Sequence, residues 1–248
     1  SVIPERVQVV AYEPSAADPP ALRIGMDGSL STLELVPGRL LEFGLGDRHC
    51  AGTIDADRHI PCDRFKAPYC DFHRTEWPCA RCTGNCAMPL ETCHEEHVVY
   101  LAAFAPSTFK VGVTRTWRLE RRLEEQGADR GVRIRTVPNG RKARSIEADI
   151  ATDLTDRARV ESKIAGLHRS VDIAAWERLL DGFQVEDSFE FSYGFDLDRQ
   201  PVAETLVRGE IVGTKGRILV LEREGTTYAV DMRDLLGYDL TTEESRTD

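Results

Sequence analysis

The sequence has no long apolar stretch, few lysines, and no cysteine outside one short segment. No apolar run approaches the roughly 20 residues that a helix needs to cross a bilayer. The first residues also lack the basic-then-apolar pattern of a signal peptide. We therefore expect a cytoplasmic protein without a membrane partner. The 248 residues, 41% hydrophobic and 30% charged, are enough for one large or two small globular domains.

Lysine supplies only five of the 32 basic residues, and the formal net charge is −10. This balance resembles proteins of halophiles that accumulate salt, in which phosphate binding depends on close contacts because salt screens distant ones. The charge is uneven: residues 110–144 hold 11 basic and four acidic residues, a net +7 that leaves −17 for the remainder. A basic island on an acidic chain is typical of a phosphate-facing site. The alternative is a solvated helix face with scattered arginines.

The seven cysteines all lie within 44 residues of one another. A disulfide framework would need an oxidising compartment, and the count is odd. Zinc fits better, because Cys79 and Cys82 have the spacing of a ligand pair, as do Cys70 and His73. Eight ligands are enough for two closed tetrahedral sites, so we predict one or two structural zinc ions that serve folding. The predicted ligands are Cys50, Cys62, Cys70, His73, Cys79, Cys82, Cys86 and Cys93.

Both ends of the chain have the pattern of short β-strands separated by glycine and proline turns. Neither end is long enough to close a core alone, so we predict that they pair into one small β-barrel or sheet, with the remaining parts inserted between them. The predicted fold class is α+β. The predicted regions are an N-terminal β region (1–49), a Cys-rich zinc segment (50–97), an α/β domain (98–185) and a C-terminal β region (186–248).

The α/β domain is expected to begin with a hairpin of strands 98–104 and 109–113, followed by a helix over 117–126. A later helix is predicted over 141–154. Arg122 shares a helical stripe with apolar neighbours, and so does Glu147. Burying either charge unpaired would cost several kcal/mol, so the two side chains are expected to pair with each other or to face a cleft.

Two short motifs lie on the predicted hairpin, Val99-Tyr100-Leu101 and Lys110-Val111-Gly112, with Lys110 ten residues after Tyr100. With Arg122 and Glu147 on later helices, this order resembles the GIY-YIG nuclease superfamily over residues 98–154. More of the chain resembles the DUF2797 family in its haloarchaeal form. That second resemblance rests on the Cys-rich segment, on both motifs, on Glu125-Gln126-Gly127-Ala128 and on the Ile146-Glu147 helix.

The nuclease resemblance implies a role for each matching residue. Glu147 would hold Mg²⁺ or Mn²⁺, and Arg122 would neutralise charge on the phosphate. Tyr100 or Lys110 would deprotonate or orient the attacking water, and Lys110 could instead contact phosphate. The remaining predicted nucleic-acid-binding residues are Gly112, where backbone would approach phosphate closely, Arg115 and Arg118.

The resemblance thus implies a divalent-metal-dependent phosphodiesterase that cleaves nucleic acid, an endonuclease of the hydrolase class. The first motif, however, reads Val-Val-Tyr rather than Gly-Ile-Tyr, and Lys110 stands where the nucleases carry a tyrosine. A zinc-containing nucleic-acid-binding or regulatory module without turnover is therefore the alternative. A third hypothesis is a protein–protein adaptor.

Overall fold

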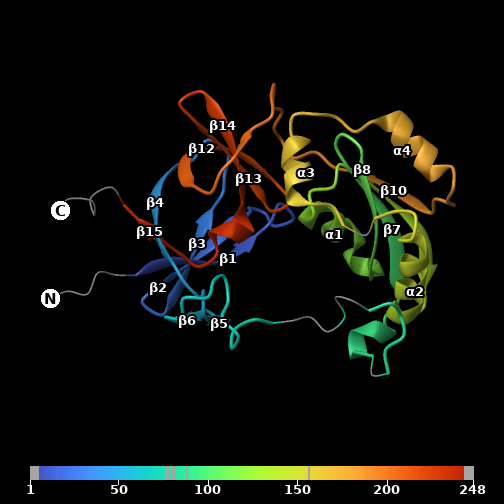
Figure 1. Ribbon diagram of the computed structural model, residues 1–248, viewed down its shortest axis with the longest axis horizontal. Coiled ribbons are helices and arrows are strands. Elements are labelled where there is room, and N and C mark those ends of the chain that lie inside the picture. Colours follow the sequence, from blue (N-terminus) through green and yellow to red (C-terminus); the bar gives the residue numbers. More distant parts are fainter. Residues whose placement is uncertain (1–5, 76–78, 80–81, 88, 156, 243–248) are drawn as a thin grey trace. The chain divides into compact units, whose positions relative to one another are not determined.

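The computed structural model describes residues 6–75, 79, 82–87, 89–155 and 157–242. The chain divides into two compact units (Figure 1). Unit 1 comprises Ser1–Thr75 and Pro201–Asp248, and unit 2 comprises Glu76–Gln200. The division falls inside the Cys-rich segment 50–97, which the sequence suggested was a single region. No helix in the described part of the chain is both long and apolar enough to span a membrane.

Unit 1 contains, in its described residues, one sheet of eleven strands. The order is β11-β14-β13-β12-β4-β15-β1-β2-β3-β6-β5, and only the β11–β14 pair is parallel. The bounds are β1 Val7–Glu13, β2 Ala21–Met26, β3 Ser29–Glu34, β4 Leu40–Arg48, β5 Thr53–Asp55, β6 Arg58–Ile60, β11 Val202–Ala203, β12 Val207–Lys215, β13 Ile218–Arg223, β14 Thr226–Asp231 and β15 Tyr238–Thr241; the 3-10 helix η4 is Met232–Leu235.

Strand β4 joins the two ends of the chain within unit 1. Its first half pairs with β12, from Leu40 to Phe43, and its second half pairs with β15, from Gly44 to Arg48. Strand β1 also pairs with β15. The core of unit 1 draws on both ends of the chain, with Leu22, Leu41 and Leu221 almost fully buried. Neither end could therefore bury these side chains without the other.

Unit 2 contains a four-stranded antiparallel sheet in the order β10-β9-β7-β8 among the described residues. Its strands are β7 His97–Phe104, β8 Thr108–Arg115, β9 Arg130–Val137 and β10 Asp187–Glu190. Its helices are α1 Leu119–Glu125, α2 Gly140–Ile150, α3 Val160–Ala165 and α4 Ile173–Leu180, with the 3-10 helices η2 Glu91–His94 and η3 Thr116–Arg118.

The central strand β7 is buried on both faces, which explains its almost unbroken apolar sequence. Alternate residues belong to different clusters because strand side chains point to opposite faces. Val99 and Leu101 pack with residues of α2 and α4, including Trp176. Val98 and Tyr100 pack instead with residues of α1. The two faces of the sheet therefore pack against helices from different parts of unit 2. Strand β8 is an edge strand of this sheet.

Candidate functional site

Four predicted zinc ligands converge in unit 1. The ligand atoms of Cys50, Cys62, Cys70 and His73 all lie within 4.8 Å of one another. The Nδ1 atom of His73 is 3.4 Å from Sγ of Cys50 and 3.3 Å from Sγ of Cys70. The backbone N–H of His73 donates to the carbonyl oxygen of Cys70 at 3.0 Å, and this tight turn brings both side chains to the same side.

Backbone N–H groups also donate hydrogen bonds to the sulfur atoms of Cys50 and Cys70. Burial raises the pKa of the Cys70 thiol. Hydrogen bonds from the backbone N–H groups of Phe72 and His73, together with those to the side chains of Cys50 and His73, outweigh burial and lower that pKa to about 6. Burial raises the pKa of the Cys50 thiol, whose sulfur accepts hydrogen bonds from the N–H groups of Gly52 and Cys70 at 3.4 Å and 3.3 Å. Three thiols and one imidazole fit a closed tetrahedral zinc site, which leaves no position for a substrate.

The other four predicted ligands belong to unit 2 and are arranged differently. Among the described residues, no second group of cysteine, histidine or carboxylate atoms converges as closely as the first. Cys79, Cys82 and Cys93 instead line the wall of a cavity. Burial raises the pKa of the Cys79 thiol, and the neighbouring Cys82 raises it further.

The start of helix α2 lies against this cysteine segment. A Cβ atom on Gly140 would be 3.1 Å from Sγ of Cys93 and 3.0 Å from Nε2 of His97. A Cβ atom on Gly84 would be 2.5 Å from the carbonyl oxygen of Arg141. The two glycines therefore let the cysteine segment and α2 approach closely.

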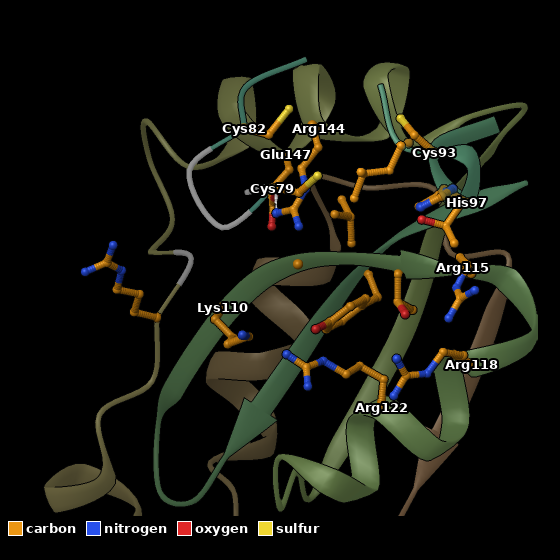
Figure 2. Close-up of a pocket in the computed structure, with 18 residues that line it drawn as sticks. Cys79, Cys82, Cys93, His97, Lys110, Arg115, Arg118, Arg122, Arg144 and Glu147 are labelled. Carbon is orange, nitrogen blue, oxygen red and sulfur yellow. Dashed lines mark hydrogen bonds and ion pairs between the residues drawn. The ribbon is translucent and has the colours of Figure 1, made fainter. Parts of the chain in front are cut away.

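The cavity in unit 2 has a volume of about 730 Å³ (Figure 2). Figure 2 shows Arg144 and Glu147 of α2 on one side of it and Arg122 of α1 on the other. All seven residues predicted to be catalytic or nucleic-acid-binding line this cavity: Tyr100, Lys110, Gly112, Arg115, Arg118, Arg122 and Glu147. The cavity thus joins residues from β7, β8, η3, α1 and α2 that span almost 50 positions in the sequence.

Tyr100 is buried against its partner on the neighbouring strand. Tyr100 and Gly112 are directly paired across β7 and β8, and a Cβ atom on Gly112 would lie 2.5 Å from the tyrosine Cζ and hydroxyl oxygen. Gly112 therefore makes room for the Tyr100 ring, where sequence reasoning expected a close phosphate. The hydroxyl of Tyr100 accepts a hydrogen bond from Nε2 of Gln126 at 2.9 Å, so its own proton is left to donate to another acceptor.

Arg118 and Arg122 are fixed at the cavity by the same carboxylate. Nη2 of Arg118 lies 3.3 Å from both oxygens of Glu125, and Nη1 of Arg122 lies 3.6 Å from one of them. Arg121 contacts Glu125 as well, at 3.2 Å. Such partly exposed ion pairs contribute little stability, about 0–1 kcal/mol each, so their main effect is to orient the guanidinium groups.

Glu147 is a buried carboxylate with 9% of its surface exposed. Its oxygen Oε2 accepts a hydrogen bond from Nη1 of Arg144 at 2.8 Å. Arg122 and Glu147 were expected either to pair with each other or to face a cleft. Both line the cavity, and each forms an ion pair with another residue.

The lining of the cavity is strongly cationic. Its charged side chains are Lys110, Arg115, Arg118, Arg122, Arg144 and Arg157, against the single carboxylate of Glu147. Sequence reasoning missed Arg144 and Arg157 as lining residues. Arg144 had a signal, since it lies three residues before Glu147 on the same helix and therefore on the same face. Arg157 follows α2 in a segment without periodicity, and no pattern indicated its position.

Together, the two units define a sheet-rich α+β protein with few helices and a Cys/His group suited to a metal ion such as zinc. A family model described as "Protein of unknown function (DUF2797)" matches residues 65–240, so the chain belongs to the DUF2797 family, as its motifs indicated. Comparisons with curated proteins and with solved structures give no match. The resemblance to GIY-YIG nucleases stays a prediction.

Proposed function

We propose that the cavity of unit 2 binds and cleaves a phosphodiester of nucleic acid with the help of Mg²⁺ or Mn²⁺. One observation carries the proposal: a single cavity collects six cationic side chains, one buried carboxylate and one tyrosine hydroxyl. Two of the neighbouring acids, Glu95 and Glu125, neutralise part of this charge through their ion pairs. Among the residues that line the cavity itself, six cations stand against one carboxylate, which favours an anionic ligand.

Each residue has a chemical task in this proposal. Arg118 and Arg122, already oriented by Glu125, would contact phosphate oxygens, for which the planar guanidinium fork is suited. Tyr100 holds its hydroxyl proton in a direction set by Gln126 and would orient the attacking water or the phosphate. Lys110 would contact phosphate from the β8 side.

Glu147 is the carboxylate that would hold the divalent ion. Mg²⁺ usually takes one or two protein carboxylates, completing its shell with water and substrate phosphate, so one buried glutamate beside an anion-binding cavity fits it. The ion, when bound, would polarise the scissile phosphate. Arg144, at 2.8 Å from Glu147, would keep that carboxylate oriented when no ion is present.

We also propose that the zinc in unit 1 is structural and that a second zinc is held in unit 2 by Cys79, Cys82, Cys86 and Cys93. That second ion would fix the wall of the cavity, because Cys79, Cys82 and Cys93 all line it. His97 offers a nitrogen close to Cys93 and could replace one of these sulfurs.

The nuclease proposal is tested by incubating labelled single-stranded and duplex DNA and RNA with the full chain and Mg²⁺ or Mn²⁺. Wild type should cut, and Glu147→Gln should abolish cutting. Arg122→Met should slow it by about 100-fold, the usual loss when a group that stabilises transition-state charge is removed. Asp149→Asn is the matched control, because Asp149 is an exposed acid on the same helix. No cutting by wild type, or equal cutting by Glu147→Gln, would contradict the proposal.

The hydrogen bond between Arg144 and Glu147 favours a second candidate, a nucleic-acid-binding module without turnover. A carboxylate oxygen already bound to a guanidinium is less available to a metal ion. This candidate predicts tight binding without cleavage. Arg118→Ala with Arg122→Ala should then weaken binding and reduce its salt dependence, by roughly 0.7–0.9 in slope for each lost phosphate contact. Unchanged affinity and slope in the double variant would rule this candidate out.

A further inference from the structure

Trp117 is the most exposed large hydrophobic side chain in the described residues of unit 2. It lies in η3, between β8 and α1, with 68% of its surface exposed. A single exposed apolar residue is common on protein surfaces and by itself indicates nothing. Trp117 differs from such a residue because several neighbours hold its ring in one orientation.

Glu95 and Arg115 form a fixed support for this ring. Nε1 of Trp117 donates a hydrogen bond to Oε2 of Glu95 at 3.0 Å, and Arg115 contacts the other carboxylate oxygen at 3.1 Å. The guanidinium of Arg115 also lies over the indole ring, 4.6 Å from its centre. With this cation over the ring, 68% of the Trp117 surface is still exposed to a ligand.

The two arginines beside this ring are also residues of the cavity. Arg115 and Arg118 both line it, and the guanidinium of Arg118 lies 5.9 Å from the centre of the Trp117 ring. A rigid aromatic surface therefore adjoins a group of cations. This combination, a basic groove with an aromatic platform, is the arrangement by which proteins bind single-stranded nucleic acids.

We propose that Trp117 stacks on an unpaired base of a single-stranded nucleic acid whose phosphates enter the cavity. This inference rests on the proposed function, because it takes nucleic acid as the ligand. It goes further in assigning the strand type. In a duplex both faces of each base are already stacked, so the indole would gain a partner only by forcing a base out, which costs free energy. A single strand offers its bases without that cost.

The test measures binding of short fluorescent oligonucleotides to the full-length Glu147→Gln protein, in which cleavage does not interfere. A single strand and a hairpin duplex of the same sequence should differ in affinity, with the single strand binding more tightly. Trp117→Ala should weaken single-strand binding about tenfold, the typical loss of one base–aromatic stack, and should leave duplex binding unchanged. Trp117→Phe keeps an aromatic face, so its affinity for the single strand should fall by less than about threefold.

Phe65→Ala is the matched control, because Phe65 is 93% exposed but belongs to unit 1. It should bind as tightly as its parent. Intrinsic fluorescence adds a second measurement: the single strand should quench tryptophan emission in the parent, and Trp117→Phe should remove most of that quenching.

The possible failures separate the two proposals. Equal single-strand affinity of Trp117→Ala and its parent overturns the stacking role while leaving the proposed function intact. Equal weakening of single-strand and duplex binding also overturns it, because a general loss of affinity does not require an unpaired base. If no oligonucleotide binds at all, both proposals are wrong.

Discussion

The candidate metal site of unit 1 and the cavity of unit 2 are both built from ionisable side chains, but they differ in how closely these side chains approach. In unit 1, the four candidate ligand atoms lie within 4.8 Å of one another, so the space between them suits one ion and nothing larger. In unit 2, six cations and one carboxylate surround about 730 Å³. Side chains that converge on a point favour folding around a metal, whereas like charges held around a space favour an external ligand.

The largest effect is expected from breaking the convergent site. Cys50 is fully buried, and Cys50→Ser should remove one zinc equivalent from the chain, measured by elemental analysis. Because a metal bound only by the folded state contributes directly to folding, the melting temperature should fall by about 10 °C or more. Unit 2 should keep its ligand binding if the two sites are independent.

His94→Asn provides the control for this prediction. His94 is an exposed histidine outside the metal group, and its replacement should change neither zinc content nor melting temperature. A Cys50→Ser protein that retains its zinc and its stability would show that the four side chains converge for a reason other than a metal.

The same contrast explains what the sequence could predict. Cys70 and His73 were recognisable because metal-ligand spacing is local, and Cys50 and Cys62 because the cysteines cluster. The separation of Cys50–His73 from Cys79–Cys93 into two units was not recognisable, since strand pairing across the whole chain determines it. The eleven-stranded order, in which β4 pairs with both β12 and β15, depends on contacts between residues about 160 to 200 positions apart. Periodicity contains no information about such contacts.

The cavity was anticipated in part. Tyr100, Lys110, Arg122 and Glu147 came from a family resemblance, and the helical stripes indicated that Arg122 and Glu147 point inward. Glu147 is buried as expected, whereas Arg122 is exposed because its long side chain reaches the open cavity. The residues that form ion pairs with Arg122 and Glu147 were not predicted. Glu125 and Arg144 lie three residues from them, close enough for pairing, but the sequence does not show which of several neighbouring charges a side chain will choose.

The next prediction tests the cavity through the packing of Tyr100. In Gly112→Ala, the new methyl group would lie 2.5 Å from the tyrosine ring, so the ring must move. Forcing an extra carbon into a packed site typically costs about 1–3 kcal/mol, and the displaced hydroxyl would also lose its bond to Gln126. Denaturant unfolding should show this loss, and nucleic-acid binding or cleavage should decrease with it.

Gly182→Ala is the matched control for Gly112→Ala. A Cβ atom there would lie 3.6 Å from the carbonyl oxygen of Leu179, which is an ordinary contact, and Gly182 is exposed in the same unit. The control should be as stable as wild type or slightly more stable. If both variants lose the same stability, the contact with Tyr100 is not the cause.

A smaller effect is expected from removing only the hydrogen bond to Tyr100. Gln126→Leu keeps a side chain of similar size but cannot donate to the hydroxyl, which should cost about 1 kcal/mol in unfolding free energy. If Tyr100 acts in the proposed reaction, the cleavage rate should fall more than substrate affinity does. Glu120→Gln, an exposed change on α1, should alter neither. A Gln126→Leu protein with wild-type kinetics would mean that the orientation of this hydroxyl is unimportant.

The smallest effect concerns the support of Trp117. Hydrogen bonds from Trp117 and then from Arg115 lower the pKa of Glu95 below its ordinary value of 4.5. A lowered carboxyl pKa in the folded protein means that these contacts are complete above that ordinary value and are lost as the pH falls through the lowered pKa. Time-resolved fluorescence anisotropy should therefore show the Trp117 ring becoming more mobile in that acidic range.

The pH titration needs a variant that cannot ionise at this position. Glu95→Gln keeps an acceptor for the indole N–H but has no charge, so Trp117 mobility should be nearly independent of pH while Arg115 loses its ion pair. Because Glu95 is on the surface, the change in overall stability should be small in both proteins. If the parent and Glu95→Gln give the same anisotropy profile, then Glu95 does not hold the ring. The orientation of Trp117 beside the cavity would then depend on the guanidinium groups of Arg115 and Arg118.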